Sequence, residues 1–181
     1  MTLSNSMQEF ILHWGEMGTR WGVNRTVAQV HALLYLSPEP LTAEDISDAL
    51  SVARSNVSTS LKELQNWDLV QIESRMGDRR DYFRTSSDVW TLFLTVVEQR
   101  VEREILPTMT MLQRLVNEAR TERPAQPIVA ARINAMHLFL EELHGWYAQV
   151  KKLPPATLHS IISIGSGITR MLPKARRRRL D

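Results

Sequence analysis

Six polar or basic side chains between residues 54 and 62 have the chemistry to contact duplex DNA. They are Arg54, Ser55, Asn56, Ser58, Thr59 and Lys62. The arginine fork fits the acceptor atoms of guanine and an amide fits adenine, so Arg54 and Asn56 are candidates for reading base edges. The hydroxyls and the lysine can instead contact phosphates, which position a protein without reading sequence. The alternative is a solvated helix face that contacts nothing.

A second basic cluster lies about twenty residues further along the chain. Arg75, Arg79 and Arg80 surround Gly77, and Asp78 stands among them. Arginines at the tip of a hairpin fit the minor groove or the phosphates at its edge. We expect Asp78 to orient Arg79 or Arg80 through an ion pair. The alternative is a charged edge that prevents strands of different molecules from pairing.

The hydrophobic pattern places the first set of residues on a helix. Val57, Leu61 and Leu64 recur at helical spacing within a helix predicted over 53–67, so the six candidates fall mainly on the opposite face. A shorter helix is predicted to end near residue 50. Two short helices separated by three or four residues are typical of a helix-turn-helix.

The elements around this pair complete a winged helix. We expect Thr42 to cap the shorter helix by accepting a hydrogen bond from the Asp45 amide. Over 69–74 and 81–85 apolar residues recur at every second position. This spacing predicts two strands joined by a charged turn. A helix-turn-helix followed directly by such a hairpin is a winged helix.

The rest of the chain is predicted to be helical. Amphipathic stripes predict helices over 3–18, 26–36, 89–116 with an interruption at Pro107, 129–150 and 158–168, with a loop over 121–127. The predicted fold is therefore mainly α, a winged helix-turn-helix with a short β-hairpin wing and long N- and C-terminal dimerisation helices.

Four segments follow from this pattern. We expect an N-terminal packing and dimerisation helix over 1–25, a DNA-binding winged helix over 26–86, a helical dimerisation and effector domain over 87–173, and a basic tail over 174–181. The helices beyond residue 86 carry more apolar surface than a lone winged helix can cover, which predicts a homodimer.

Composition excludes several classes of protein. The 181 residues include no cysteine, so disulfides, thiolate nucleophiles and sulfur-ligated metals are absent. The sequence shows no nucleophile–base motif and no glycine-rich phosphate loop, which predicts that the protein is not an enzyme and needs no cofactor. No apolar run could span a bilayer and no signal peptide is visible, so a cytoplasmic protein without membrane contact is expected.

The net charge of +2 conceals an uneven distribution. Six of the 22 basic residues lie within 170–181, and the remainder of the chain is net acidic. The predicted tail is expected to be disordered, because like charges repel. It could add nonspecific affinity for DNA by releasing counterions.

One helical face has the spacing of a metal site. His137, Glu141 and His144 lie at i, i+4 and i+7, which can present three ligands to a divalent ion. Amphipathic helices produce such sets by chance. We therefore predict no metal.

Four segments of the winged helix resemble a known family in combination. Residues 41–46, 53–58, 61–67 and 77–83 resemble the multiple-antibiotic-resistance-regulator (MarR) superfamily. More closely these segments resemble its glycine-betaine-synthesis-repressor (GbsR) branch, as do Trp90 and residues 98–100 and 103–107. The resemblance covers roughly residues 8 to 116.

The resemblance implies a homodimeric winged-helix transcription factor that binds a palindromic operator in double-stranded DNA. It implies that the six residues from Arg54 to Lys62 are the recognition residues and that Arg79 and Arg80 are wing contacts. Ala53 departs from the pattern, which often has a serine able to cap the helix, and we expect Ser51 to serve instead.

The branch is associated with choline or betaine, which aromatic cages hold. Trp14, Trp21, Trp146 and Tyr147 are the one grouping to consider for such a cage, although core packing is the ordinary explanation for each.

We therefore expect a sequence-specific DNA-binding transcriptional regulator, a homodimeric repressor that responds to a small-molecule effector of unknown class. The alternative is a helical adaptor whose winged helix binds protein and not DNA. The surface from Arg54 to Lys62 lacks the large apolar anchors that protein interfaces use, which favours the regulator.

Overall fold

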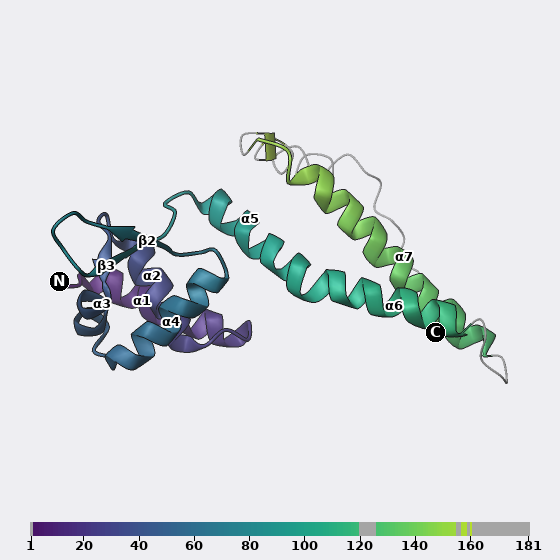
Figure 1. The fold of residues 1–181 in the computed structure, drawn as a ribbon, viewed down its shortest axis with the longest axis horizontal. Helices are drawn as coiled ribbons and strands as arrows, with labels where there is room; N and C mark the ends of the chain where they lie inside the picture. The colour runs from purple at the N-terminus through teal and green to yellow at the C-terminus, as the bar shows by residue number, and fades with distance from the viewer. Residues whose placement is uncertain (1, 120–125, 155–156, 159, 161–181) are drawn as a thin grey trace. The chain divides into compact units, whose positions relative to one another are not determined.

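The computed structural model describes residues 2–119, 126–154, 157–158 and 160 (Figure 1). The chain divides into two compact units after Arg100, and each is described by itself below. The predicted basic tail and nearly all of the predicted helix over 158–168 lie outside the described residues. The functions expected for the four predicted segments stay predictions.

The first unit contains the predicted helix-turn-helix and hairpin. Its elements are α1 (Asn5–Arg20), α2 (Arg25–Leu36), β1 (Leu41–Thr42), α3 (Ala43–Leu50), α4 (Arg54–Asn66), β2 (Gln71–Ser74), β3 (Asp81–Arg84) and α5 (Val89–Arg100). The predicted fold class is confirmed, since this is a mainly helical chain with a winged helix. The strand β1 was not predicted, because two residues show no period.

Helices α1 and α2 approach each other unusually closely. A Cβ built on Gly18 would lie 2.6 Å from the Cβ of Ala28, so the glycine allows the two backbones to come together. Side chains cap both helices: Ser4 accepts a hydrogen bond from the Met7 amide and Asn24 accepts one from the Thr26 amide. The α1 helix is thereby fixed against the winged helix.

The helix α3 begins with the predicted cap. Thr42 Oγ1 accepts a hydrogen bond from the Asp45 amide at 3.2 Å, and Asp45 Oδ2 accepts one from the Thr42 amide at 2.9 Å. The two residues form a reciprocal capping box, which satisfies two amides that the helix leaves without an internal partner. The prediction for Thr42 is confirmed.

The expectation that Ser51 caps α4 is wrong. Ser51 lies in the left-handed region, with φ 54°, and forms the C-cap of α3. The N-cap of α4 is Ala53, which makes no side-chain hydrogen bond. Two residues separate Ser51 from the start of α4, and the turn uses them to reverse the chain.

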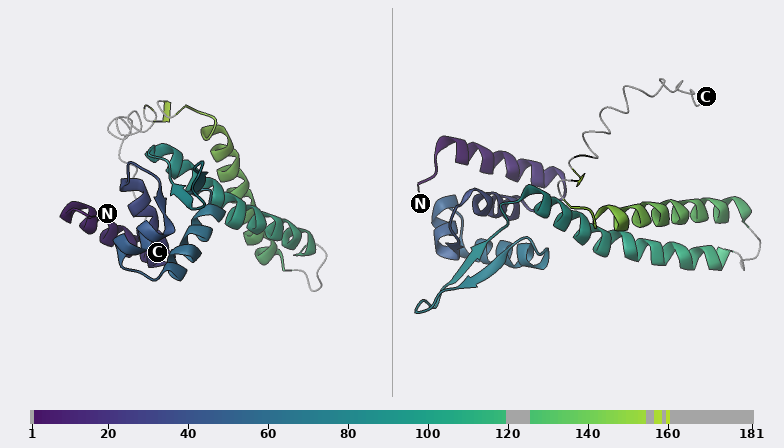
Figure 2. Two further views of the ribbon diagram at one scale, coloured as in Figure 1. Left: turned by 60° about the vertical axis from the view of Figure 1, so that its left-hand side comes forward. Right: turned by 90° about the horizontal axis from the view of Figure 1, so that it is seen from above.

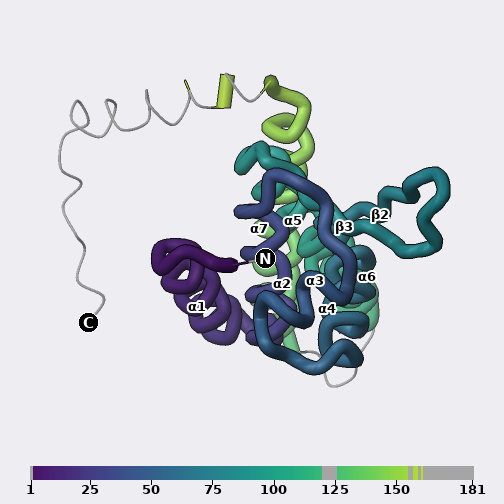
Figure 3. Tube along the Cα trace, turned by 90° about the vertical axis from the view of Figure 1, so that its left-hand side faces the viewer, coloured from purple at the N-terminus to yellow at the C-terminus, as the bar shows by residue number. Residues whose placement is uncertain are grey.

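The three strands form a small antiparallel sheet in the order β1-β3-β2. The central strand β3 pairs Tyr82 with Thr42 on one side and with Glu73 on the other. Gly77 adopts φ 83° in the turn between β2 and β3, a conformation that favours glycine. The resulting hairpin projects away from the helices of its unit (Figure 3).

The inward-facing side chains of α2, α3 and α4 form much of the core of the first unit. Its largest fully buried side chains are Val30, Leu33, Ile46 and Val57. Burying such a side chain stabilises the fold by about 1.5–3 kcal/mol relative to exposing it. The recognition helix candidate, α4, therefore has a fixed inner face.

The end of α5 is attached to the end of α4. The buried Gln99 donates a hydrogen bond from Nε2 to Asp68 Oδ2 at 2.8 Å. The Arg100 guanidinium lies 5.8 Å from the centre of the Trp67 ring, within the range of a cation–π contact. Both partners immediately follow α4, so α5 holds the carboxyl end of that helix.

The second unit is a hairpin of two long helices, α6 (Leu106–Ala119) and α7 (Pro127–Val150), which lie side by side (Figures 1 and 2). A π-helical turn, η1 (Val101–Ile105), precedes α6. This π-helical turn is the interruption that was predicted at Pro107. Proline has no amide hydrogen, and its ring crowds the carbonyl of Arg103. A wider turn relieves both conflicts.

Candidate nucleic-acid interface

The helix α4 presents the predicted polar residues to solvent. Val57, Leu61 and Leu64 are buried, which fixes the rotation of the helix. On the outer side Arg54, Ser55, Asn56, Thr59 and Lys62 are exposed, and Ser58 is half-buried. The structure therefore brings all six candidates onto or beside one accessible surface, which we call the α4 face.

The start of the α4 face has the polarity to receive an anion. Ala53, the N-cap residue, has no side-chain acceptor for the first amides of the helix. These amides and the positive end of the helix dipole favour a phosphate oxygen. Thr59 donates its hydroxyl hydrogen to the Ser55 carbonyl at 3.0 Å, so toward a ligand this hydroxyl acts as an acceptor.

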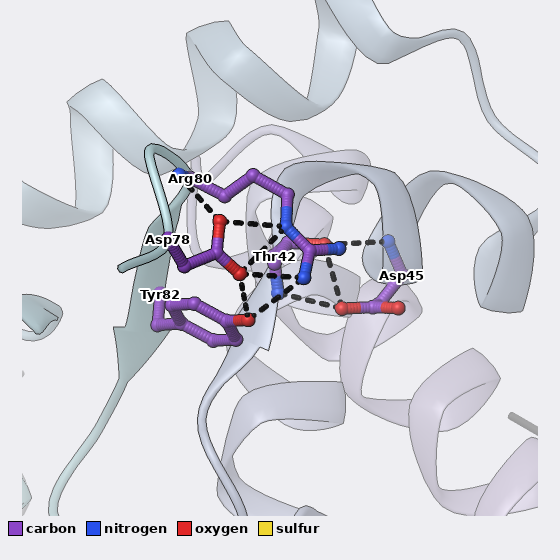
Figure 4. Close-up of polar contacts among 5 residues, drawn as sticks. All are labelled: Thr42, Asp45, Asp78, Arg80 and Tyr82. Atoms are coloured by element: carbon purple, nitrogen blue, oxygen red, sulfur yellow. Dashed lines mark hydrogen bonds and ion pairs between the residues drawn. The ribbon is translucent and has the colours of Figure 1, made fainter. Parts of the chain in front are cut away.

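The predicted ion pair at the hairpin tip involves Arg80. Asp78 accepts hydrogen bonds from Arg80 Nη2 at 2.6 Å, from Arg80 Nε at 3.1 Å and from the Arg80 amide at 2.9 Å (Figure 4). The prediction that Asp78 orients one of the two arginines is therefore confirmed. Arg79 is exposed and forms no hydrogen bond or ion pair within the described part of the chain.

Sequence reasoning missed Tyr82, which lies at the centre of this cluster. Its hydroxyl donates to Asp78 Oδ2 at 2.8 Å and accepts from Arg80 Nη2 at 3.0 Å (Figure 4). The guanidinium of Arg75 lies 4.1 Å from the centre of the Tyr82 ring. A tyrosine four residues after Asp78 is the sequence signal that points to this contact.

The polar cluster also fixes the charge state of its members. Hydrogen bonds from the side chain and backbone of Arg80, and then from Tyr82, hold the pKa of Asp78 well below its usual range. The same carboxylate raises the pKa of Arg80. The charge of Arg80 is therefore locally compensated, whereas Arg79 has no such carboxylate partner among the described residues.

An open hollow of about 520 Å³ lies between the end of α2 and the base of the hairpin. Its lining includes Tyr35, Glu39, Glu73, Arg75 and Arg84. Arg75 is 3.9 Å from Glu39 and Arg84 is 3.7 Å from Glu73, both at the surface. Pairs this long and this exposed contribute little to stability, so a polar ligand could exchange with them at small cost.

The residues considered for a metal site do not form one in the part of the chain that the structure describes. His137 is buried and its Nδ1 lies 3.5 Å from Glu141 Oε2. Among the described residues no group of three or more histidine, aspartate and glutamate side chains could hold a metal ion. Glu141 therefore serves as a partner of His137.

The aromatic residues considered for a cage belong to different units. Trp14 stacks on Phe10 with ring centres 5.3 Å apart, which is a packing contact. Trp21 is 66% exposed. In the second unit Tyr147 is buried and Trp146 is exposed.

None of the helices in the described part of the chain has the length and apolar character needed to cross a bilayer.

Comparison with known proteins gives consistent matches. Residues 21–81 match the model of the MarR family. A putative HTH-type transcriptional regulator of Bacillus subtilis, YvaV, is 20% identical over 146 residues, which are 80% of this chain and 81% of that protein. The HTH-type transcriptional repressor GbsR of the same species is 24% identical over 93 residues, 51% of each chain.

The fold has a counterpart among solved structures. A crystal structure of a transcriptional regulator matches with a TM-score of 0.63 and 22% identity, over 80% of this chain and 95% of that one. The family model spans the helix-turn-helix and ends in the hairpin, where the α4 face and the basic tip lie. The winged helix thus coincides with the segment that matches the MarR family model, residues 21–81.

Proposed function

We propose that this protein is a DNA-binding transcriptional regulator, and not an enzyme, that represses transcription by occupying promoter DNA. The observation that carries the proposal is the α4 face, an exposed polar surface beside a basic hairpin within a MarR-family winged helix. The matched relatives bear the names of transcriptional regulators and repressors. Such a protein shares a compartment with the chromosome, so the proposal includes a cytoplasmic location.

The α4 helix enters the major groove in this proposal. Arg54 and Asn56 read base edges, and the hydroxyls with Lys62 contact bases or phosphates. The hairpin lies alongside, where Arg75, Arg79 and Arg80 reach the phosphates or the minor groove. The α4 face offers no large apolar anchor, which disfavours the alternative of a protein-binding adaptor.

The protein acts as a homodimer on a palindromic operator. Support comes from α7, a helix of 24 residues on which seven large apolar side chains are exposed within the chain. They are Ile128, Val129, Met136, Leu138, Phe139, Leu143 and Trp146. An apolar surface of this extent is typical of a partner interface. Two copies related by a two-fold axis would place the two α4 helices on half-sites about one helical turn apart.

Two finer assignments complete the proposal. The protein belongs to the GbsR branch, supported by the 24% identity with GbsR over half the chain. It also responds to a small polar effector, which we place in the hollow beside Arg75, because a ligand there would contact the base of the wing. A screen of small charged metabolites for a shift in melting temperature tests the second assignment.

Selection from a random duplex library tests the central proposal. We expect purified protein to recover a palindromic site and to bind it far more tightly than bulk DNA. Arg54→Ala should cost about 1–3 kcal/mol of operator binding and relax the preference at one base pair. Arg20→Ala, which removes the same charge from an exposed position on α1, is the matched control and should retain the base preference.

The alternative function predicts the opposite result. If no site is selected, and if binding vanishes at physiological salt, the contact with DNA is only electrostatic and the adaptor becomes the better description.

Sedimentation of the protein with Phe139→Asp tests the dimer. We expect this change on the exposed face of α7 to dissociate the two copies.

A further inference from the structure

We propose that Tyr82 is the positioning residue of the wing, which fixes Arg80 through its hydroxyl and Arg75 through its ring before DNA is bound. This inference rests on the proposed function, since it assigns a role in DNA binding. Tyr82 was not among the residues that the sequence singled out. Figure 4 shows its hydroxyl between Asp78 and Arg80.

Tyr82 stands on a rigid base. It lies in the central strand of the sheet, where its backbone pairs with Thr42 on one side and with Glu73 on the other. Its side chain is only 8% exposed. A buried ring on a strand paired along both edges has little freedom, so groups that contact it share its fixed position.

The hydroxyl of Tyr82 completes the restraint on Arg80. This hydroxyl donates to Asp78 at 2.8 Å and accepts from Arg80 Nη2 at 3.0 Å. Arg80 therefore uses Nε and Nη2 within the cluster, and among the described residues its Nη1 has no partner. Because a guanidinium carries five N–H donors in a rigid plane, Arg80 can be held from one side and still offer two donors to a phosphate.

The ring of Tyr82 restrains the second arginine. The guanidinium of Arg75 lies 4.1 Å from the ring centre, which is the geometry of a cation–π contact. Arg79 lacks any such restraint within the described chain. Of the three arginines near the hairpin tip, Arg75 and Arg80 are thus ordered in advance, and Arg79 has no such contact among the described residues.

The arginines would contribute to DNA binding in two different ways, Arg80 through its fixed geometry and Arg79 through its charge. The charge of Arg80 is compensated by Asp78, so its value to the complex lies in a contact made with little loss of side-chain freedom. Arg79 contributes an uncompensated charge, which acts through release of counterions. Loss of the Tyr82 hydroxyl should therefore weaken binding without changing its salt dependence, whereas Arg79→Ala should lower the salt slope by about one.

A double-mutant cycle on the selected operator tests the hydroxyl. The variants of the full-length protein are Tyr82→Phe, Arg80→Ala and the pair, each checked for folding by circular dichroism. Tyr82→Phe keeps the buried ring and should weaken binding about two- to tenfold, the cost of ordering one long side chain. In the Arg80→Ala background the same change should cost nothing further, because the group that it positions is gone.

Other outcomes overturn the proposal. Unchanged affinity of Tyr82→Phe, or an equal loss in both backgrounds, means that the hydroxyl does not act through Arg80. For the ring, Arg75→Lys keeps the charge and loses the flat stacking surface, and affinity equal to wild type would refute that part. If the wild-type protein itself selects no site, the proposed function has failed. If it selects a site that Tyr82→Phe binds equally well, only this inference has failed.

Discussion

Replacement of Gly18 by alanine should force α1 and α2 apart. The new Cβ would lie 2.6 Å from the Cβ of Ala28, whereas non-bonded carbons prefer about 3.5–4.0 Å. Neither methyl group can rotate away, so the two backbones must separate by roughly 1 Å. Crowding of this kind costs about 1–3 kcal/mol. Alanine recovers about 0.5–1 kcal/mol of helix propensity, which leaves a net loss of about 0–2.5 kcal/mol, centred on about 1 kcal/mol.

Two other helical glycines provide matched controls. A Cβ on Gly15 would meet the Cγ of Gln29 at 2.7 Å and that of Arg25 at 3.2 Å, and both belong to flexible side chains that can move. Gly15→Ala should therefore lie within about 0.5 kcal/mol of wild type. A Cβ on Gly145 would meet nothing within 4 Å, so Gly145→Ala should stabilise α7 by about 0.5–1 kcal/mol.

Thermal and urea unfolding of the three variants measure these differences. For the first unit, residues 1–100, a change of 1 kcal/mol corresponds to a shift in melting temperature of about 4–8 °C. The expected loss for Gly18→Ala can therefore be measured. The order of stability should be Gly145→Ala, then Gly15→Ala, then Gly18→Ala. If Gly18→Ala is as stable as Gly15→Ala, the close contact between α1 and α2 does not limit the packing.

Three further predictions concern stability and its pH dependence. Thr42→Val removes the oxygen that accepts from the Asp45 amide and should lower the free energy of unfolding by about 1 kcal/mol in urea titrations; no change would show that the capping box is dispensable. Burial lowers the pKa of His31 from 6.5 to about 4, so the unfolded state binds the proton first and stability should fall by about 3 kcal/mol between pH 6.5 and 4. His31→Gln, which can still bond to Thr85, should remove that slope above pH 4, and an unchanged slope would assign it to other groups. Ser51→Gly relieves a left-handed residue at φ 54° and should raise the melting temperature, whereas a decrease would mean that the serine side chain has a role of its own.

The α4 face could be predicted because a few buried residues determine it. Val57, Leu61 and Leu64 recur at helical spacing, and once they face inward the remaining side chains must face out. The hairpin was predictable for a similar reason, since its apolar residues recur at every second position and those of the surrounding helices at every third or fourth. The strand β1 was not, because its identity depends on pairing with β3 and not on its own two residues.

The roles of the wing arginines could not be read from their spacing. Arg79 and Arg80 both follow Asp78 within two residues, and either could have been its partner. The structure decides between them, because Arg80 and Tyr82 both contact the same carboxylate. Ser51 was assigned to the wrong helix for a related reason: its φ of 54°, and not its hydroxyl, determines its place.

Because α5 contacts the residues that follow α4, a motion of α5 would turn α4 about its carboxyl end. Gln99 and Arg100 hold Asp68 and Trp67 at one end, while Arg54 and Asn56 lie at the other. Thirteen residues at 1.5 Å each give α4 a length of about 20 Å. A tilt of about 10° at the held end moves Arg54 by about 3 Å, roughly the rise of one base pair. In the proposed complex with DNA, a small rotation of α5 would therefore move the start of α4 from one base pair toward the next.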